Sequence, residues 1–125
     1  MRQTGILTLA GGHIWTVMLL SAVLVGCASL HESPDFVRHR YSQLTEPYDR
    51  SDVLYFDAMF DPSYPDGDPV AEKKRMEWLS GWLEQVHMCP DGYEIVKRRP
   101  FDMLENNPAR YDIRYEVKCK IQSES

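Results

Sequence analysis

Apolar and polar residues alternate strictly along positions 110–121. The apolar positions are Tyr111, Ile113, Tyr115, Val117, Cys119 and Ile121, and between them stand Arg110, Asp112, Arg114, Glu116, Lys118 and Lys120. Successive side chains of a β-strand point to opposite faces of a sheet. The pattern therefore predicts a strand with one buried and one solvent-exposed face, and it places Cys119 on the buried face.

Two other segments are predicted to be strands. Residues 52–60 carry mostly apolar side chains on both alternating faces, which favours an inner strand of a sheet. Residues 93–99 form a less regular strand. Pro100 and the Asn106-Asn107-Pro108 stretch separate it from the alternating segment.

A helix is predicted between the first two strands. Asp68 can cap it and Pro69 suits its first position, whereas Pro90 stops it and Asp91-Gly92 makes a turn. The side expected to pack on the sheet consists of Ala71, Met76, Trp78, Leu79, Trp82, Leu83 and Val86. Glu72 and Arg75 interrupt that side in the first turns, so we expect the helix to overhang the sheet there.

Together these elements predict an α+β fold in β-α-β-β order, with one helix packed on a small three-stranded mixed sheet. The domain would span residues 48–125. Residues 28–47 have no clear hydrophobic period and contain several Ser and Pro residues. We interpret residues 27–47 as a tether that can hold a short helical turn near residues 36–41.

An almost uncharged apolar run, residues 6–25, follows Arg2 and leads into Leu24-Val25-Gly26-Cys27. This four-residue pattern resembles the lipobox of bacterial lipoprotein precursors. The resemblance implies that residues 1–26 are a signal peptide, that a lipid is attached to the Cys27 thiol, and that a peptidase cuts before Cys27. An uncleaved anchor is the alternative, although Gly, Thr and Ser make the run weakly apolar for that role. Both interpretations place residues 28–125 outside the cytoplasm.

Ala28 directly follows the lipobox cysteine. In Gram-negative lipoproteins an Asp at this position is associated with inner-membrane retention. The resemblance therefore implies an outer-membrane protein that faces the periplasm, with the inner membrane or the cell surface as alternatives. The membrane would be a partner through the covalent lipid on Cys27, because two or more acyl chains hold a protein stably.

The charge of the mature part disfavours two kinds of partner. Arg2 is the one charged residue of segment 1–26, so the mature part has a net charge of −6, against −5 for the full chain. Nucleic-acid-binding domains are typically basic, and we expect no nucleic acid as a partner. The same sign disfavours lying flat on anionic lipid, so a lipid anchor would have to hold the domain.

Cys89 and Cys119 remain once Cys27 carries lipid. An even number of cysteines in a small exported domain indicates a disulfide. By closing a loop of about 30 residues it would contribute roughly 3–4 kcal/mol. Two free thiols or a metal site are the alternatives, and the chain has neither a CxxC pair nor adjacent histidines to favour a metal.

Signals of catalysis or metal binding are weak. Four acids crowd one segment: Asp57, Asp61, Asp66 and Asp68. They could hold Ca²⁺, but their spacing does not match an EF-hand. The alternative is that these Asp residues form turns and that one of them caps the helix. The mature histidines are His31, His39 and His87. No GxSxG motif accompanies them, which disfavours a nucleophile–histidine pair. With signals this weak, we expect no catalytic residue, no metal, no cofactor and no enzymatic activity.

Three residues are candidates for binding: Trp78, Arg98 and Arg99. Trp78 lies at the edge of the apolar side of the helix and could stack on a sugar, whereas we expect Trp82 in the core. Basic runs such as residues 73–75 and 97–99 are solvated by default. Arg98 and Arg99, at a strand end, are the better candidates for contact with an anionic partner.

The segments Cys89-Pro90-Asp91-Gly92-Tyr93 and Tyr115-Glu116-Val117-Lys118-Cys119-Lys120 are similar to small envelope lipoproteins of unassigned function. The similarity implies no activity. We expect a non-catalytic accessory or adaptor protein that binds another envelope protein. A glycan-binding module for peptidoglycan or lipopolysaccharide is the alternative, and a cell-wall hydrolase ranks third.

Overall fold

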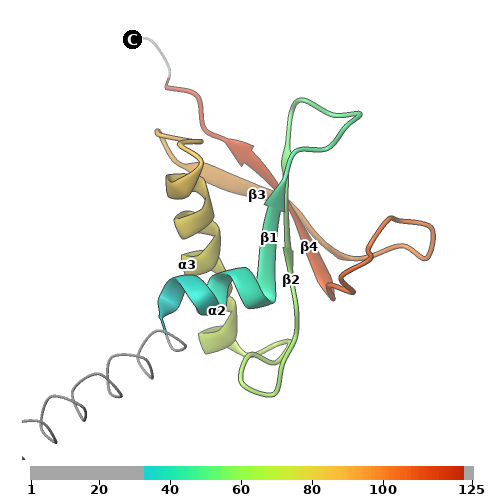
Figure 1. Ribbon diagram of the computed structural model, residues 1–125. Coiled ribbons are helices and arrows are strands. Elements are labelled where there is room, and N and C mark those ends of the chain that lie inside the picture. The colour runs from blue at the N-terminus through green and yellow to red at the C-terminus, as the bar shows by residue number, and fades with distance from the viewer. Residues whose placement is uncertain (1–32, 123–125) are drawn as a thin grey trace, which may run out of the picture. The chain divides into compact units, whose positions relative to one another are not determined.

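The structure, a computed structural model, describes residues 33–122 (Figure 1). Its elements follow in the order α2 (Pro34–Tyr41), β1 (Ser42–Thr45), β2 (Leu54–Ala58), α3 (Pro69–Gln85), β3 (Tyr93–Pro100) and β4 (Ile113–Cys119). The chain divides into two compact units, Met1–Val37 and Arg38–Ser125, and α2 runs across their boundary.

Residues 33–37 are the described part of the first unit and begin α2. The Ser33 hydroxyl accepts a hydrogen bond from the Phe36 N–H at 3.3 Å, and the Ser33 carbonyl accepts one from the Val37 N–H at 3.2 Å. A Ser cap followed by Pro34 is a favoured helix start. This helix lies within the segment interpreted as a tether.

The second unit contains a four-stranded sheet in the order β1-β2-β4-β3, with every neighbouring pair antiparallel. The predicted α+β class is confirmed. The single helix and the three-stranded mixed sheet are wrong, because α2 and β1 are additional and all neighbouring strands are antiparallel. β1 was missed because four residues show too little alternation to predict a strand. The sheet thus begins at Ser42, inside the segment 27–47.

α3 starts as predicted. The Asp68 carboxylate accepts hydrogen bonds from the N–H groups of Val70 and Ala71 at 3.4 and 3.3 Å, and Pro69 occupies the first turn. The helix ends at Gln85, before the predicted stop at Pro90. We call the face of the sheet that α3 covers the inner face and the opposite one the outer face (Figure 1).

The inner face forms the apolar core. Phe56 and Tyr115 are register partners on neighbouring strands, and their ring centroids are 5.5 Å apart. The buried apolar residues are Val53, Leu54, Phe56, Ala58, Ala71, Trp78, Leu79, Leu83, Ile113, Tyr115 and Val117. Most of them belong to the predicted apolar sides, so the alternation identified this face correctly.

Arg75 contradicts the expected overhang of the helix, because it is 0% exposed. Its guanidinium donates hydrogen bonds to the carbonyl oxygens of Tyr64 at 3.0 Å and Pro65 at 3.2 Å, and it pairs with Glu72 at 3.1 Å. A buried charge is tolerated when its donors are satisfied in this way. The segment between β2 and α3 therefore folds over the start of the helix.

Cys89 and Cys119 form a disulfide, as predicted. Cys89 opens the turn after α3, in which the Gly92 N–H donates to the Cys89 carbonyl at 3.1 Å. Gly92 has a φ of 99°, a backbone conformation that favours glycine. The disulfide joins this turn to the end of β4.

Within residues 33–122, no helix is long and apolar enough to cross a membrane. The predicted signal peptide, lipobox and lipidated Cys27 lie outside the described residues.

Candidate functional site

Trp78 lies in the interior rather than at the surface. It is 4% exposed, its ring meets Tyr64 edge-on at 4.9 Å, and it stacks on Tyr41 at 6.1 Å. Trp82 is half-buried, and its Nε1 donates to the Ser42 hydroxyl at 3.0 Å. Trp78 therefore offers no open ring face to a sugar, and the two indoles connect α3 with the segment around Tyr41 and Ser42.

Arg98 points toward the inner face at the start of α3. Its guanidinium pairs with Asp66 at 2.9 Å and Glu72 at 3.3 Å, and it lies over the Tyr115 ring at 5.5 Å. The Tyr115 hydroxyl donates to both Glu72 oxygens, at 2.8 and 2.9 Å. The acids beside Arg98 therefore satisfy much of its charge within the fold.

Glu72 is the centre of this cluster. Burial opposes its ionisation, but hydrogen bonds from Tyr115, Arg98 and Arg75 outweigh burial and lower the pKa of Glu72. Burial also raises the pKa of Tyr115. An open hollow of about 360 Å³ lies beside Glu72 and Arg98. A Glu72 that stays ionised is suited to holding the arginines rather than to donating a proton.

Arg99 points to the opposite side of the sheet from Arg98, as successive strand residues do. Its two terminal nitrogens donate to the two Glu105 oxygens, both at 2.7 Å. The predicted binding candidates Trp78, Arg98 and Arg99 are thus separated into an interior ring cluster and the two faces of the sheet. They do not form one binding site.

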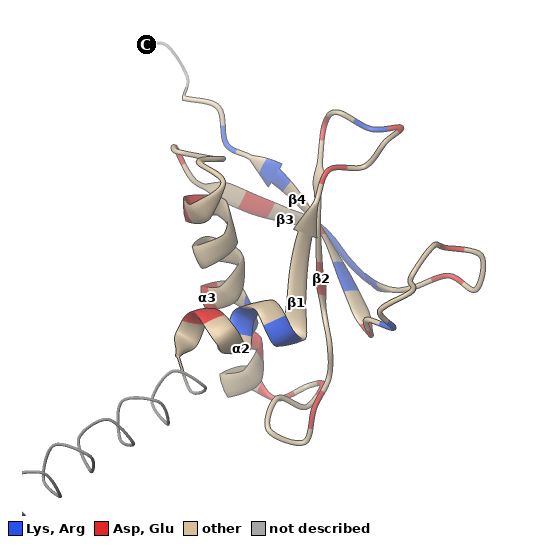
Figure 2. Ribbon diagram, in the orientation of Figure 1, with Lys and Arg blue, Asp and Glu red and all other residues tan. Residues whose placement is uncertain are grey.

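The outer face differs from the prediction, because its centre is buried. Asp57 is 0% exposed, Glu116 is 6% exposed and Arg114 is 8% exposed, although the alternation predicted a solvent-exposed face for Arg114 and Glu116. Figure 2 shows acidic and basic segments on neighbouring strands of the sheet. Opposite charges on adjacent strands allow these polar residues to be buried together.

Asp57 and Arg114 form the most buried ion pair of the outer face. They are register partners on β2 and β4, and the Arg114 guanidinium donates two hydrogen bonds to the Asp57 carboxylate, at 2.7 and 2.9 Å. Arg114 also lies over the rings of Tyr55 at 4.1 Å and Phe101 at 4.6 Å. A planar guanidinium suits both bidentate pairing and ring stacking, which explains Arg rather than Lys here.

Glu105 extends the pairing into the connection between β3 and β4, residues 101–112. It accepts a third hydrogen bond from Arg114 at 3.0 Å in addition to the two from Arg99. The hydrogen bonds from Arg99 are the main reason that the pKa of Glu105 falls to about 2. Glu105 is therefore ionised at neutral pH and ties this loop to two strands.

Glu116 extends the pairing in the other direction. It lies 3.5 Å from Arg99 and pairs with Arg50, which in turn pairs with Asp52 at 3.0 Å. One chain of alternating charge therefore crosses the outer face. We call it the outer-face network: Asp57, Arg114, Glu105, Arg99, Glu116, Arg50 and Asp52.

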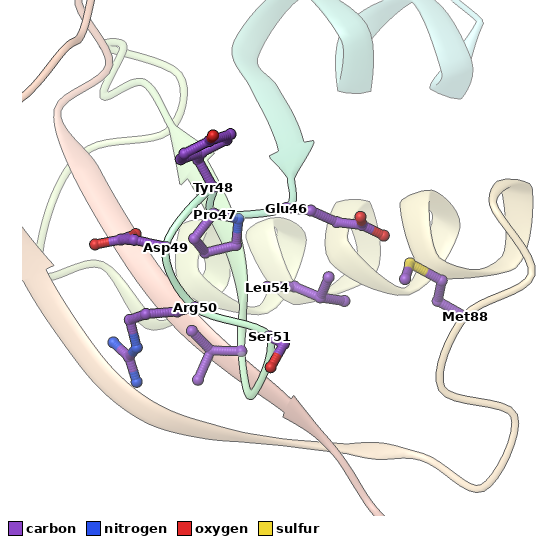
Figure 3. Close-up of a pocket in the computed structure, with 9 residues that line it drawn as sticks. Glu46, Pro47, Tyr48, Asp49, Arg50, Ser51, Leu54 and Met88 are labelled. Atoms are coloured by element: carbon purple, nitrogen blue, oxygen red, sulfur yellow. The ribbon is translucent and has the colours of Figure 1, made fainter.

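The loop between β1 and β2, residues 46–53, borders an open hollow of about 420 Å³. In Figure 3 the Glu46, Leu54 and Met88 side chains point into one space, and Arg50 extends toward the other side. Tyr48 belongs to this loop, and its side chain is fully exposed. The hollow combines an aromatic ring, apolar atoms and polar groups.

The loop of residues 101–112 presents two apolar side chains. The Glu105 N–H donates to the Asp102 carbonyl at 3.1 Å, which closes a turn with Met103 and Leu104 at its middle positions. Both side chains are fully exposed. We call residues 102–105 the Met–Leu turn.

The four acids that suggested a calcium loop have separate roles. Asp57 pairs with Arg114, Asp61 accepts from the Ser63 N–H at 2.9 Å, Asp66 pairs with Arg98, and Asp68 caps α3. Among the described residues, no three His, Cys, Asp or Glu side chains are grouped to hold a metal ion. The His39 ring contacts the Trp82 ring in a tilted arrangement with centroids 4.4 Å apart, His87 follows α3, and His31 lies outside the described residues.

Comparison with family models, curated proteins and solved structures finds no match to this chain. Sequence reasoning missed the ion pairs of Asp57, Arg114, Glu105 and Arg50. The one signal for them was a charged residue at the centre of an otherwise apolar strand, Asp57.

Proposed function

We propose that this protein is a lipid-anchored, non-catalytic adaptor of the bacterial envelope that binds another envelope protein. The lipobox at Leu24-Val25-Gly26-Cys27 supports the anchor. The Cys89–Cys119 disulfide supports an exported domain, because disulfides persist mainly in oxidising compartments. An outer-membrane position facing the periplasm follows from Ala28, as the resemblance implies.

The observation that carries the binding role is the contrast between paired charges and unpaired apolar side chains. The outer-face network and the Glu72 cluster neutralise their own arginines, whereas Met103 and Leu104 are fully exposed at a turn. Two adjacent apolar side chains that are exposed on a well-held loop are available to a partner protein, and loops commonly carry binding residues.

The anchor is tested by metabolic labelling with a fatty-acid analogue. The wild-type protein should incorporate the label and fractionate with outer membranes, and Cys27→Ser should abolish both. Ala28→Asp should move the labelled protein to the inner-membrane fraction. An unlabelled wild-type protein that begins at Met1 would refute the anchor.

The adaptor role is tested by crosslinking in intact cells followed by mass spectrometry of the co-purified envelope proteins. We expect one reproducible protein partner whose recovery does not depend on detergent. Recovery of no protein in repeated experiments, with the lipoprotein itself present at normal abundance, would contradict the role.

A glycan-binding function is the second candidate, and Tyr48 favours it. A fully exposed ring beside a hollow with polar and apolar walls can stack on a sugar and leave hydroxyls for hydrogen bonding. The purified domain should then sediment with isolated peptidoglycan sacculi, and Tyr48→Ala should remain in the supernatant. Equal sedimentation of both proteins, or of neither, would exclude this site.

A further inference from the structure

Two apolar residues occupy positions that turns normally give to other residue types. The middle of a turn favours Gly, Asn, Asp, Ser or Pro, for reasons of backbone geometry. The Met–Leu turn has Met103 and Leu104 there, and both are fully exposed. Neither side chain contributes to the core, so both are available for a contact outside the domain.

The turn is held firmly in place. The Glu105 carboxylate, besides its ion pairs, accepts a hydrogen bond from the Asp102 N–H at 2.8 Å. Farther along the loop, the Asn107 side chain bonds both the N–H and the carbonyl of Tyr111, at 2.9 and 2.8 Å. A loop that is ordered before binding loses less conformational entropy on binding, which strengthens a small contact.

The turn lies on the side of the second unit's sheet that is away from Arg38 (Figure 1). Arg38, the first residue of that unit, donates to Gln85 of α3 at 2.8 Å and lies over the Trp82 ring. The loop of residues 101–112 extends beyond the sheet on the side away from α3 (Figure 1).

The charge near the Met–Leu turn limits which kind of partner could bind it. Arg99 and Arg114 neutralise Glu105, so the loop of residues 101–112 keeps Asp102 and Asp112 against Arg110, and the mature part has a net charge of −6. A second copy of this chain would bring like charge to the contact, and an anionic bilayer would do the same. Basic residues around an apolar site would instead match Asp102, which is exposed beside Met103.

We propose that the Met–Leu turn inserts into an apolar pocket on a partner protein of the envelope, and that Lys or Arg residues line the edge of this pocket. This rests on the proposed function and names the surface and the chemistry of the partner. Leu104 and Met103 fill this pocket, and Asp102 pairs with a Lys or Arg at its edge. Met suits such a contact because its side chain adapts to an irregular surface.

The first test places a photo-crosslinking amino acid at Leu104 in the full-length protein in living cells. Matched probes stand at Lys73, an exposed residue of α3, and at Tyr48. We expect a single protein adduct from position 104 that is absent from position 73. A lipid adduct, a dimer of this chain or no adduct at position 104 would overturn the proposal.

The three probes separate this proposal from the function on which it rests. A protein adduct from position 48 with none from position 104 would leave the adaptor role standing and refute the Met–Leu turn as its surface. Silence at all three positions, with the protein folded and disulfide-bonded, would count against both.

The second test uses the crosslinked partner in purified form. Leu104→Asp should weaken its binding about tenfold or more, because it places a charge in the apolar contact. Asp102→Lys should weaken binding at low salt and reduce its salt dependence, and Lys73→Ala should leave affinity unchanged. Wild-type affinity in Leu104→Asp would overturn the proposal.

Discussion

The two faces of the sheet are both buried at their centres, but by different physics. On the inner face, Phe56 and Val117 pack under α3 as the apolar alternation predicts. On the outer face, Asp57 and Arg114 are buried as an ion pair that aromatic rings cover. The inner face shows that the apolar positions of an alternating segment locate a core. The outer face shows that the polar positions of the same segment need not be exposed to solvent.

The largest expected effect comes from breaking the most buried ion pair. Asp57→Ala should lower the free energy of unfolding by about 3–5 kcal/mol, because Arg114 would remain buried without its bidentate partner and would keep only the single contact with Glu105. Leu79→Ala on the inner side should lower it by a similar amount, about 2–5 kcal/mol. Urea denaturation of both variants measures the comparison directly.

The double variant Asp57→Leu with Arg114→Leu sharpens the same test. Replacing both charges by apolar side chains should restore much of the stability lost in Asp57→Ala, since an apolar pair avoids the desolvation of two ions. Wild-type stability in Asp57→Ala would contradict the burial of the Asp57–Arg114 pair on the outer face.

The disulfide belongs to the turn after α3 and the end of β4, and it should act independently of the outer-face network. Replacing Cys89 and Cys119 together by Ser should lower the free energy of unfolding by about 3–4 kcal/mol. Its effect should add to that of an outer-face variant such as Glu105→Ala. Strong non-additivity would mean that the two regions are coupled.

Glu105→Ala should have an intermediate effect of about 2 kcal/mol at neutral pH, because hydrogen bonds between charged groups are lost at a partly exposed site. The pKa of Glu105 is about 2 in the folded protein and 4.5 in the ordinary case. Because the pKa is lowered by folding, ionised Glu105 stabilises the fold at every pH above its ordinary pKa. This stabilisation is lost as pH falls from about 5 to 2. The stability difference between wild type and Glu105→Ala should therefore shrink over this range, and a pH-independent difference would contradict the ion pairs.

The smallest effect on stability should come from the Met–Leu turn. Met103→Ser and Leu104→Ser should change the free energy of unfolding by less than about 0.5 kcal/mol, because both side chains are exposed. Thermal melts of these variants should superimpose on that of the wild type. A loss above about 1 kcal/mol would mean that the side chains pack within the domain.

Sequence reasoning identified local features that depend on adjacent residues. Asp68 and Pro69 predicted the start of α3 from capping chemistry, and the alternating segment predicted β4 and the face that carries Tyr115. The cysteine pair predicted the disulfide. These features need only a short stretch of chain, or a residue type whose chemistry limits its partners.

The parts that were not predicted depend on contacts between distant positions. Arg114 meets Asp57 only because β4 lies next to β2, and the sequence order did not show that pairing. Arg75 fits the interior because carbonyl groups of Tyr64 and Pro65 face it. Charged residues are usually exposed, and partners that permit their burial cannot be read from spacing alone.

The two exposed loops illustrate the same limit for the candidate site. Tyr48 and Leu104 gave no signal in the sequence, because an aromatic or apolar residue between strands can equally pack inward. Arg50 and Glu105 tie these loops to the outer face through ion pairs with distant residues, which spacing along the chain does not show. The predicted candidates Trp78, Arg98 and Arg99 instead have their main contacts within the fold.

The claim that the outer-face network holds the Met–Leu turn is tested most directly by amide hydrogen exchange in residues 101–112 at neutral pH. The N–H groups of Asp102 and Glu105 should be protected in the wild type, because they donate to the Glu105 carboxylate and the Asp102 carbonyl. Glu105→Ala should remove the protection at position 102, whereas the exposed-pair control Glu77→Ala should keep it. Rapid exchange at both positions in the wild-type protein would contradict the claim.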